Sequence, residues 1–300
     1  MHLYLNGEIV KKEDAHISPF DHGFLYGMGL FETFRIYDGH PFLLDDHLVR
    51  LQDGLSELQI KLPLNRDSVM VIIHDLLSAN GLKQAYVRLN ISAGKGEVGL
   101  PFTDYYEDPS ILVFMKEIPP VLGEKKAILL KTPRNTPEGE FRLKSHHFLN
   151  NIYGKREIGN NPTVEGIFLT REGFLAEGIT SNLFWIKGDK LFTPAHQTGI
   201  LKGITRDFVI DLAKSLGLDV QEGLFQPMDI LQSDEAFVTN SIQEIVPLGA
   251  IENHKLQGKN GPITKKLQSI YSQYKRSLWS KNDLPKENQK WIKTEKEDHS

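Results

Sequence analysis

The sequence predicts a mixed protein, α+β or α/β in class, with two domains. Short apolar or alternating runs that are typical of strands are interspersed with amphipathic runs that are typical of helices, and no regular βαβ repeat is present. A proline-rich break, EIPPVLG at 117–123, interrupts every periodic pattern. The length of 300 residues is sufficient for two domains of medium size.

The first part of the chain, residues 1–117, is expected to form a smaller N-terminal α/β domain. Asn6-Gly7 between two apolar runs predicts a β-hairpin. Leucines that recur at three- and four-residue spacing predict an amphipathic helix within 43–60. A second helix is expected at 67–79. Strands are expected at 34–37, 85–92 and 110–115.

A hinge at 118–123 is expected to lead into a larger C-terminal domain at 124–278. Its strands are short and apolar, and turns containing glycine separate some of them. Helices are expected at 148–158, 205–216 and 262–278, and strands at 127–132, 166–170, 174–178, 183–187, 190–194, 235–239 and 245–251. Residues 279–300 are rich in charged and polar side chains, which predicts a disordered polar tail.

Composition excludes several classes of function. The net charge of -4, without a long basic block, argues against nucleic acid as a partner. The absence of cysteine excludes disulfides, thiol nucleophiles and thiolate metal sites, and it suits the cytoplasm. No segment approaches the roughly 20 apolar residues that span a bilayer, and the N-terminus does not resemble a signal peptide. We therefore expect a soluble cytoplasmic protein that has no membrane partner.

The segment FRLKSHHFLNN, residues 141–151, is the first of three candidate sites. Lys144 lies among apolar residues just before a predicted helix. A lysine drawn into such a site loses hydration, so its pKa falls and its amine becomes a usable nucleophile. The alternative is an ordinary surface lysine, which is the commoner case. His146 and His147 are adjacent and have no third ligand nearby, so we expect no metal site.

The second candidate is GILKGITRDFVIDLAKSLG, residues 199–217. A glycine precedes Ile204 and Thr205, which begin a predicted amphipathic helix. The exposed backbone N–H groups and the dipole of a helix N-terminus favour an anion, and the Thr205 hydroxyl could add a hydrogen bond. The alternative is a capped helix that has no ligand.

Glu177 and Arg50 complete the candidates. Glu177 lies between short strands beside a glycine, where a carboxylate could hold a pyridine nitrogen protonated. Arg50 lies one helical turn after His47 and could bind a phosphate through its planar fork of donors. The alternatives are a surface glutamate at the end of a strand and a solvated arginine on a helix.

Together these segments resemble the class IV aminotransferases, which are pyridoxal-phosphate enzymes of fold type IV and share the fold of D-amino-acid aminotransferase. The resemblance covers residues 1 to about 275. It is carried by seven motifs in the same order, namely HGFLYGMGLFE (22–32), HLVRL (47–51), AYVRL (85–89), RLKSHHFLNN (142–151), EGITSNLF (177–184), ILKGITR (200–206) and FVTNSIQEIVP (237–247).

The resemblance implies a role for each matching residue. Lys144 matches the lysine that holds pyridoxal 5'-phosphate as a Schiff base and then acts as the catalytic base, and Glu177 matches the carboxylate that faces the pyridine nitrogen. The remaining cofactor positions, four of them in the phosphate cup, are Arg50, Thr180, Ile204, Thr205, Asn240 and Ser241. The resemblance also implies two-domain homodimers.

Three activities share this scaffold, and the motifs discriminate among them. The D-amino-acid enzymes resemble one another in an Arg-x-His clamp that SAGKGEVGLPF (92–102) lacks, and in a tyrosine where this chain has Phe31. The branched-chain enzymes carry a tyrosine near the position of Phe148 and Gly-Thr in place of Asn240-Ser241. Their substrate strand nevertheless resembles AYVRL, so a branched-chain aminotransferase remains an alternative.

The segments at 18–35 and 134–151 most resemble the aminodeoxychorismate lyases of Gram-positive bacteria. This implies elimination from 4-amino-4-deoxychorismate, a small substrate with two carboxylates, to give 4-aminobenzoate and pyruvate for folate biosynthesis. Arg88 is expected to bind one carboxylate, although a structural arginine is the alternative. The other expected substrate residues are Tyr26, Phe31 and Tyr86. A scaffold that binds the cofactor without catalysis is the remote alternative.

Overall fold

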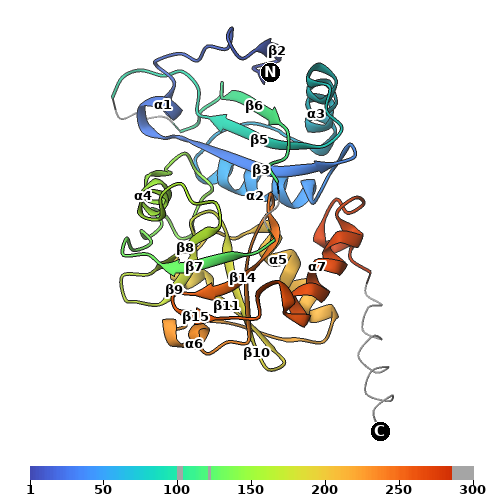
Figure 1. Cartoon of the computed structure of the whole chain (residues 1–300). Coiled ribbons are helices and arrows are strands. Elements are labelled where there is room, and N and C mark those ends of the chain that lie inside the picture. Colours follow the sequence, from blue (N-terminus) through green and yellow to red (C-terminus); the bar gives the residue numbers. More distant parts are fainter. Residues whose placement is uncertain (100–103, 121–122, 286–300) are drawn as a thin grey trace. The chain divides into compact units, whose positions relative to one another are not determined.

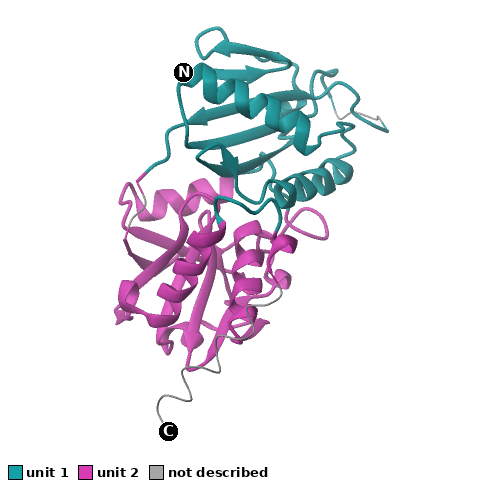
Figure 2. Ribbon diagram, turned by 90° about the vertical axis from the view of Figure 1, so that its right-hand side faces the viewer, with its two compact units in different colours: residues 1–119, 143–148, 275–280 teal, residues 120–142, 149–274, 281–300 magenta. Residues whose placement is uncertain are grey.

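The computed structural model describes residues 1–99, 104–120 and 123–285. Two residues of the expected hinge and residues 286–300 of the expected tail therefore lie outside the described residues. The chain divides into two compact units, shown in Figure 2. Unit 1 comprises Met1–Pro119, Leu143–Phe148 and Lys275–Ser280. It therefore includes two short segments that follow the expected N-terminal domain in the sequence. Unit 2 comprises Pro120–Arg142, Leu149–Tyr274 and Lys281–Ser300.

Unit 1 contains a six-stranded sheet among its described residues, in the order β2-β1-β6-β5-β3-β4, and each neighbouring pair is antiparallel. Its strands are β1 (His2–Leu5), β2 (Glu8–Lys11), β3 (Gly29–Tyr37), β4 (His40–Pro41), β5 (Ala85–Ser92) and β6 (Ser110–Lys116). Helices α2 (Leu44–Glu57) and α3 (Arg66–Asn80) pack against this sheet, and their apolar faces join one core with β3, β5 and β6 (Figure 1). A short helix, α1 (His22–Tyr26), precedes β3.

Local sequence explains most of unit 1. Asn6 and Gly7 both have positive φ and connect β1 to β2, which confirms the predicted hairpin. Helix α3 begins at a capping box centred on Asn65 and ends at the left-handed Gly81. Strand β3 is five residues longer than the predicted 34–37. It is buried on both faces, so it lacks the polar alternation by which a half-exposed strand is recognised.

Unit 2 is built on a nine-stranded sheet in its described part, with strand order β12-β11-β10-β13-β14-β7-β8-β9 and β15 paired to β14. Three neighbouring pairs are parallel and the others antiparallel, so the sheet is mixed. The strands are β7 (Lys125–Leu129), β8 (Val164–Leu169), β9 (Leu175–Gly178), β10 (Asn182–Lys187), β11 (Lys190–Pro194), β12 (Asp219–Gly223), β13 (Glu235–Asn240), β14 (Glu244–Ile251) and β15 (His254–Lys255).

The helices of unit 2 confirm the three predictions within a few residues. They are α4 (Leu149–Ile158), α5 (Ile204–Ser215), α6 (Pro227–Leu231) and α7 (Pro262–Tyr274), with short 3₁₀ turns at His196–Thr198, Gly258–Asn260 and Lys281–Asp283. Helix α7 ends four residues before the predicted 278, and the residues that follow it, 275–280, belong to unit 1. Leu267 and Tyr271 anchor α7, and Tyr271 packs edge-on against Phe208 of α5 at 5.6 Å between ring centroids.

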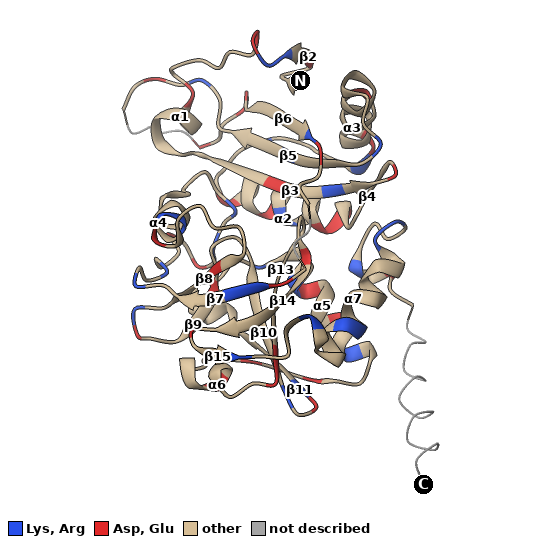
Figure 3. Ribbon diagram, in the orientation of Figure 1, with Lys and Arg blue, Asp and Glu red and all other residues tan. Residues whose placement is uncertain are grey.

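Acidic and basic residues are interspersed along the described ribbon of both units, as Figure 3 shows. This distribution agrees with the absence of a basic block in the sequence. Within the described residues, no helix combines the length and the apolar character that crossing a membrane requires.

Candidate active site

The segment that carries Lys144 extends the sheet of unit 1 along one end of β3. The Phe31 N–H donates to the Lys144 carbonyl at 2.9 Å, and the His146 N–H donates to the Gly29 carbonyl at 3.0 Å. A β-bridge joins Leu30 to the residue between them. The backbone of Lys144 is therefore fixed by strand-type hydrogen bonds and does not belong to a freely mobile loop.

The Lys144 side chain is partly buried and lies over an aromatic ring. Its Nζ is 4.6 Å from the centroid of the Phe31 ring, and the Cζ of Arg88 is 3.6 Å from the same centroid. Phe148 packs edge-on against Phe31, with 5.8 Å between the ring centroids. Unit 1 thus brings together an amine, a guanidinium and two phenylalanines from three separate parts of the sequence, at positions 31, 88 and 144–148.

Arg88 and Tyr86 lie on the same face of β5, two residues apart. Burial lowers the pKa of Arg88, while the charge of Tyr86 and a side-chain hydrogen bond with it act in the opposite direction. Arg88 Nε donates to Asn90 Oδ1 at 2.9 Å, which orients the guanidinium. The arrangement is that of a partly desolvated cation at the same aromatic ring as Lys144, which suits a carboxylate ligand.

Tyr26 lies at the end of α1. Its hydroxyl accepts from the Gly99 N–H at 2.7 Å, and its ring packs against His22 with 5.0 Å between centroids. Its carbonyl is 3.2 Å from Nε2 of His147, so Tyr26 contacts the Lys144 segment through backbone and not through its hydroxyl.

Arg50 is part of a buried charged cluster in unit 1. Its Nε donates to Oε1 of Glu32 at 2.7 Å, and its Nη2 donates to Oε2 at 2.6 Å. His47, one turn earlier on α2, bonds the same Oε2 through Nδ1 at 2.6 Å. The Glu32 and His47 side chains are each only 1% exposed. Two residues of α2 are therefore held by one carboxylate of β3.

Electrostatics fix the charge state of this cluster. Burial by itself would raise the pKa of Glu32, but the charges of Arg50 and His47 and their hydrogen bonds hold it at about 2. Burial lowers the pKa of His47 below its usual 6.5 and outweighs the attraction of Glu32. At neutral pH the Glu32 carboxylate is therefore ionised.

Glu177 lies at the end of β9 in unit 2, and its side chain is 5% exposed. Its Oε1 accepts from Arg134 Nε at 2.8 Å. Its Oε2 accepts from the Leu201 N–H at 3.1 Å and from Asn182 Nδ2 at 3.3 Å. The predicted carboxylate is thus inside the protein and oriented from three directions, which argues against the alternative of a surface glutamate.

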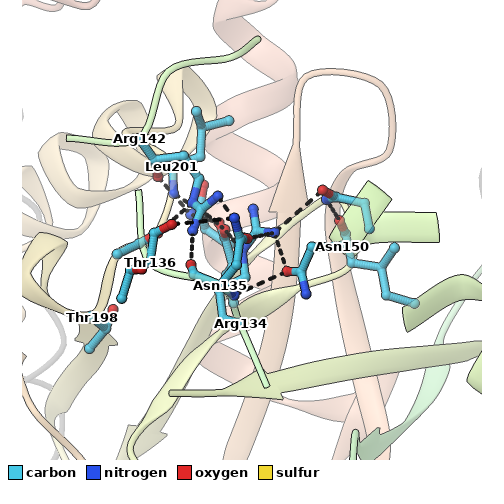
Figure 4. Close-up of polar contacts among 12 residues, drawn as sticks. Arg134, Asn135, Thr136, Arg142, Asn150, Thr198 and Leu201 are labelled. Carbon is cyan, nitrogen blue, oxygen red and sulfur yellow. Dashed lines mark hydrogen bonds and ion pairs between the residues drawn. The ribbon is translucent and has the colours of Figure 1, made fainter. Parts of the chain in front are cut away.

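Two arginines from the loop that precedes Lys144, Arg134 and Arg142, contact this carboxylate. Figure 4 shows both arginines among their polar partners. Arg134 Nη1 also donates to Asn150 Oδ1 at 2.7 Å. Arg142 lies 3.9 Å from Glu177 and donates to the carbonyls of Gly199 and Asn135. Burial, followed by repulsion from Arg134, lowers the pKa of Arg142 to about 10. The cluster links the loop to the strand and to the segment before α5.

The residues of the predicted anion site lie at and near the N-terminus of α5. The Thr205 side chain is buried, and its hydroxyl is 3.2 Å from the hydroxyl of Ser241. Asn240, next to Ser241, donates from Nδ2 to the Thr180 carbonyl at 3.1 Å. Helix α5 begins at Ile204 after Gly203, where a Cβ would lie 2.0 Å from Asn182 Oδ1, so the close approach requires glycine. Unit 2 therefore brings its phosphate candidates together.

The sequence patterns did not indicate Glu32, Arg134 or Arg142 as members of these clusters. They indicated His47 only through its spacing to Arg50. A carboxylate within the apolar run GLFETFRIY was an available signal, because a buried charge requires a partner. The identity of that partner depends on how β3 packs against α2, which the spacing of residues does not reveal.

Comparison of the sequence with known proteins identifies relatives along nearly its whole length. The sequence profile described as "Amino-transferase class IV" matches residues 29–251. The aminodeoxychorismate lyase of Bacillus subtilis (strain 168) is 48% identical over 273 residues, which are 90% of this chain and 93% of that protein.

Solved structures show the same fold. The branched-chain amino acid aminotransferase of Escherichia coli is similar with a TM-score of 0.81 and 28% identity, over 91% of this chain and 94% of that one. A second branched-chain amino acid aminotransferase, solved in complex with N-(5'-phosphopyridoxyl)-L-glutamate, is similar with a TM-score of 0.81 and 25% identity, over 92% and 94% of the two chains.

Proposed function

We propose, since this chain belongs to the class IV amino-transferase family, that it is a pyridoxal-phosphate-dependent aminodeoxychorismate lyase. The observation that carries this proposal is its 48% identity to the Bacillus subtilis lyase over 90% of the chain. The reaction would convert 4-amino-4-deoxychorismate into 4-aminobenzoate and pyruvate. The absence of cysteine supports the cytoplasm as the proposed location.

The residues of unit 2 fit pyridoxal 5'-phosphate. The helix N-terminus at Ile204 offers backbone N–H groups, and the Thr205 and Ser241 hydroxyls converge beside it, which is a donor set suited to a phosphate. Glu177 is a buried carboxylate paired with Arg134, and a carboxylate suits a protonated pyridine nitrogen. By resemblance, Lys144 and Arg50 of unit 1 would hold the same group.

When bound, the cofactor would supply an aldehyde group and a pyridine ring that can accept an electron pair. Lys144, released from the aldehyde, would take the proton from C4 of the substrate as general base. The C3–O bond then breaks, the enolpyruvyl group leaves and gains a proton to become pyruvate, and the remaining ring becomes aromatic. Lys144 would hold the cofactor again once 4-aminobenzoate has left.

Arg88 is our candidate for binding a substrate carboxylate. It lies beside the same aromatic ring as Lys144 and is partly desolvated, so a carboxylate would gain a charge-assisted hydrogen bond there. Tyr86, on the same face of β5, would orient it. Phe31 would form the apolar floor beneath the substrate ring.

Transamination is the second candidate, favoured by the solved aminotransferase structures. Two assays separate the candidates. Chorismate, glutamine and an aminodeoxychorismate synthase should yield 4-aminobenzoate and pyruvate when the purified protein is added. In parallel, 2-oxoglutarate with leucine or with D-alanine should yield little glutamate. Rapid transamination without 4-aminobenzoate would reject the lyase assignment.

We also propose a homodimer. Leu149, Ile152 and Tyr153 on α4 are each more than 40% exposed. Ile152 and Tyr153 follow Leu149 by three and four residues, so the three side chains form one apolar face. In unit 1, Phe20 and Phe24 are exposed as well. Faces of this kind mark protein interfaces. Sedimentation should give a mass near twice 34.1 kDa, and Ile152→Glu should lower it toward the monomer.

A further inference from the structure

We propose that Glu32 is a positioning residue for the cofactor phosphate and acts through Arg50. The inference rests on the proposed function, because it assumes that Arg50 binds the phosphate of pyridoxal 5'-phosphate. Glu32 itself would not contact the cofactor. Its contribution would be to fix the direction of the guanidinium before the phosphate arrives.

The geometry of the Glu32–Arg50 pair supports this role. Both carboxylate oxygens of Glu32 bind the same edge of Arg50, at 2.7 Å and 2.6 Å, in a bidentate fork. This geometry fixes the plane of the guanidinium as well as its position. His47 binds Oε2 at 2.6 Å and prevents the carboxylate from rotating away from Arg50. The guanidinium of Arg50 is therefore fixed to β3 through Glu32.

The burial of Glu32 supports the same role. Glu32 is 1% exposed and lies at the centre of a strand that is otherwise apolar on most of its length. Replacing a buried ion pair by packed apolar side chains is often neutral or stabilising, so stability alone does not account for a charge at this position. Fixing the direction of a ligand-binding arginine does account for it.

The charge of Glu32 and the geometry that it imposes on Arg50 have opposite expected effects on phosphate binding. The negative charge of Glu32 repels a phosphate, so removing it would tighten binding if charge dominated. Immobilising a long side chain in advance, in contrast, removes an entropic cost worth about 2- to 10-fold in affinity. Because both oxygens of Glu32 bind Arg50, the plane that contains the donor N–H groups of Arg50 also stays fixed. We infer that geometry dominates, because Glu32 uses both of its oxygens on one guanidinium edge.

The test compares two probes that differ only in the phosphate. Apoprotein is titrated with pyridoxal 5'-phosphate and with pyridoxal, and binding is followed by tryptophan quenching and visible absorbance. In Glu32→Gln and Glu32→Asp, the Kd for pyridoxal 5'-phosphate should rise about 2- to 10-fold. The Kd for pyridoxal should not change. Arg50→Gln should show the same selective loss, and a larger one.

Glu235→Gln serves as the matched control. Glu235 is a buried carboxylate of unit 2 that accepts from the backbone N–H groups of Ile263 and Thr264, so it tests the general cost of losing such a group. Its two Kd values should equal those of the wild type. Thermal melts of every apoprotein establish which variants are folded before titration.

Three outcomes would overturn the inference. Tighter binding by Glu32→Gln with unchanged Glu32→Asp would show that charge dominates. Equal weakening for both probes would show a merely structural role, and unchanged binding would show no role. If Arg50→Gln binds both probes normally, the assumption about Arg50 fails instead. Failure of the lyase assignment is separate, since it appears as cofactor binding without 4-aminobenzoate.

Discussion

Arg134 donates a hydrogen bond from Nε to Oε1 of Glu177 at 2.8 Å, and each side chain is 5% exposed. The pair connects the loop before Lys144 to the end of β9. Water is largely excluded from it, so neither charge can be compensated by solvent if the other is removed. The loop and the carboxylate are therefore energetically coupled.

Arg134→Met should lower the free energy of unfolding of the apoprotein by about 3 kcal/mol, because it leaves the Glu177 carboxylate buried without its hydrogen-bonded charged partner and with Arg142 only at 3.9 Å. Urea denaturation measures this change. Lys190→Met is the control, since Lys190 and Asp219 form a pair in the same unit that is about half exposed. It should change the stability by less than about 1 kcal/mol. Equal losses in both variants would contradict the coupling.

Lys144→Ala should abolish covalent attachment of the cofactor and reduce lyase turnover by at least about 10²–10⁴-fold, because the amine is both the attachment point and the general base. Borohydride reduction followed by intact-mass spectrometry should show the adduct in the wild type and not in the variant. Lys155→Ala, at an exposed position of α4, should retain the adduct. An adduct that persists in Lys144→Ala would reject the assignment of this lysine.

Phe148→Tyr should shift activity from elimination toward transamination. The Phe148 ring is 5.8 Å from that of Phe31, beside the ring over which Lys144 lies, so a new hydroxyl would enter the predicted cofactor environment. One added hydrogen bond of about 1 kcal/mol corresponds to a change of about 5-fold in the ratio of glutamate to 4-aminobenzoate formed. Phe225→Tyr, at a phenylalanine that packs against the apolar core of unit 2, should leave the ratio unchanged.

Acid should destabilise the apoprotein in two stages through Glu32 and His47. The pKa of His47 is lowered by burial, so below pH 6.5 the unfolded chain binds a proton that the folded chain binds less well, and stability falls. The pKa of Glu32 drops from 4.5 to about 2 on folding, so its contribution is complete above pH 4.5 and is lost as the pH falls toward 2. That contribution is about 3 kcal/mol.

Urea unfolding between pH 3 and pH 8 measures this dependence. Glu32→Gln cannot release a proton at position 32, so its stability should vary less between pH 3 and pH 5 than that of the wild type. A variant whose pH profile is parallel to that of the wild type would show that other carboxylates account for the acid sensitivity.

Thr205→Ala should weaken the binding of pyridoxal 5'-phosphate by about 5-fold, which corresponds to the loss of one hydrogen bond, and should leave pyridoxal binding unchanged. The hydroxyl faces Ser241 at the N-terminus of α5. Ser215→Ala at the other end of the same helix removes a hydroxyl that bonds the Leu212 carbonyl, so it is the matched control. If Thr205→Ala and Ser215→Ala had the same effects on the binding of pyridoxal 5'-phosphate and of pyridoxal, the phosphate site would be rejected.

The sequence by itself determined the local elements and the family. Asn6-Gly7 specified a hairpin and the leucines of 43–60 specified α2, because turn conformation and helical periodicity depend on neighbours in the chain. The seven ordered motifs identified the family, which the profile match over 29–251 confirms. They also singled out Lys144 and Glu177 as candidates, but no spacing within the chain indicated what either side chain contacts.

The tertiary structure decided the environments of those candidates. Lys144 meets Phe31 only because residues 144–146 bond to the end of β3, and Arg50 meets Glu32 only because α2 packs on that strand. Such contacts join residues that are distant in sequence. Their formation depends on the burial of apolar surface elsewhere, so a charge pattern along the chain does not contain them.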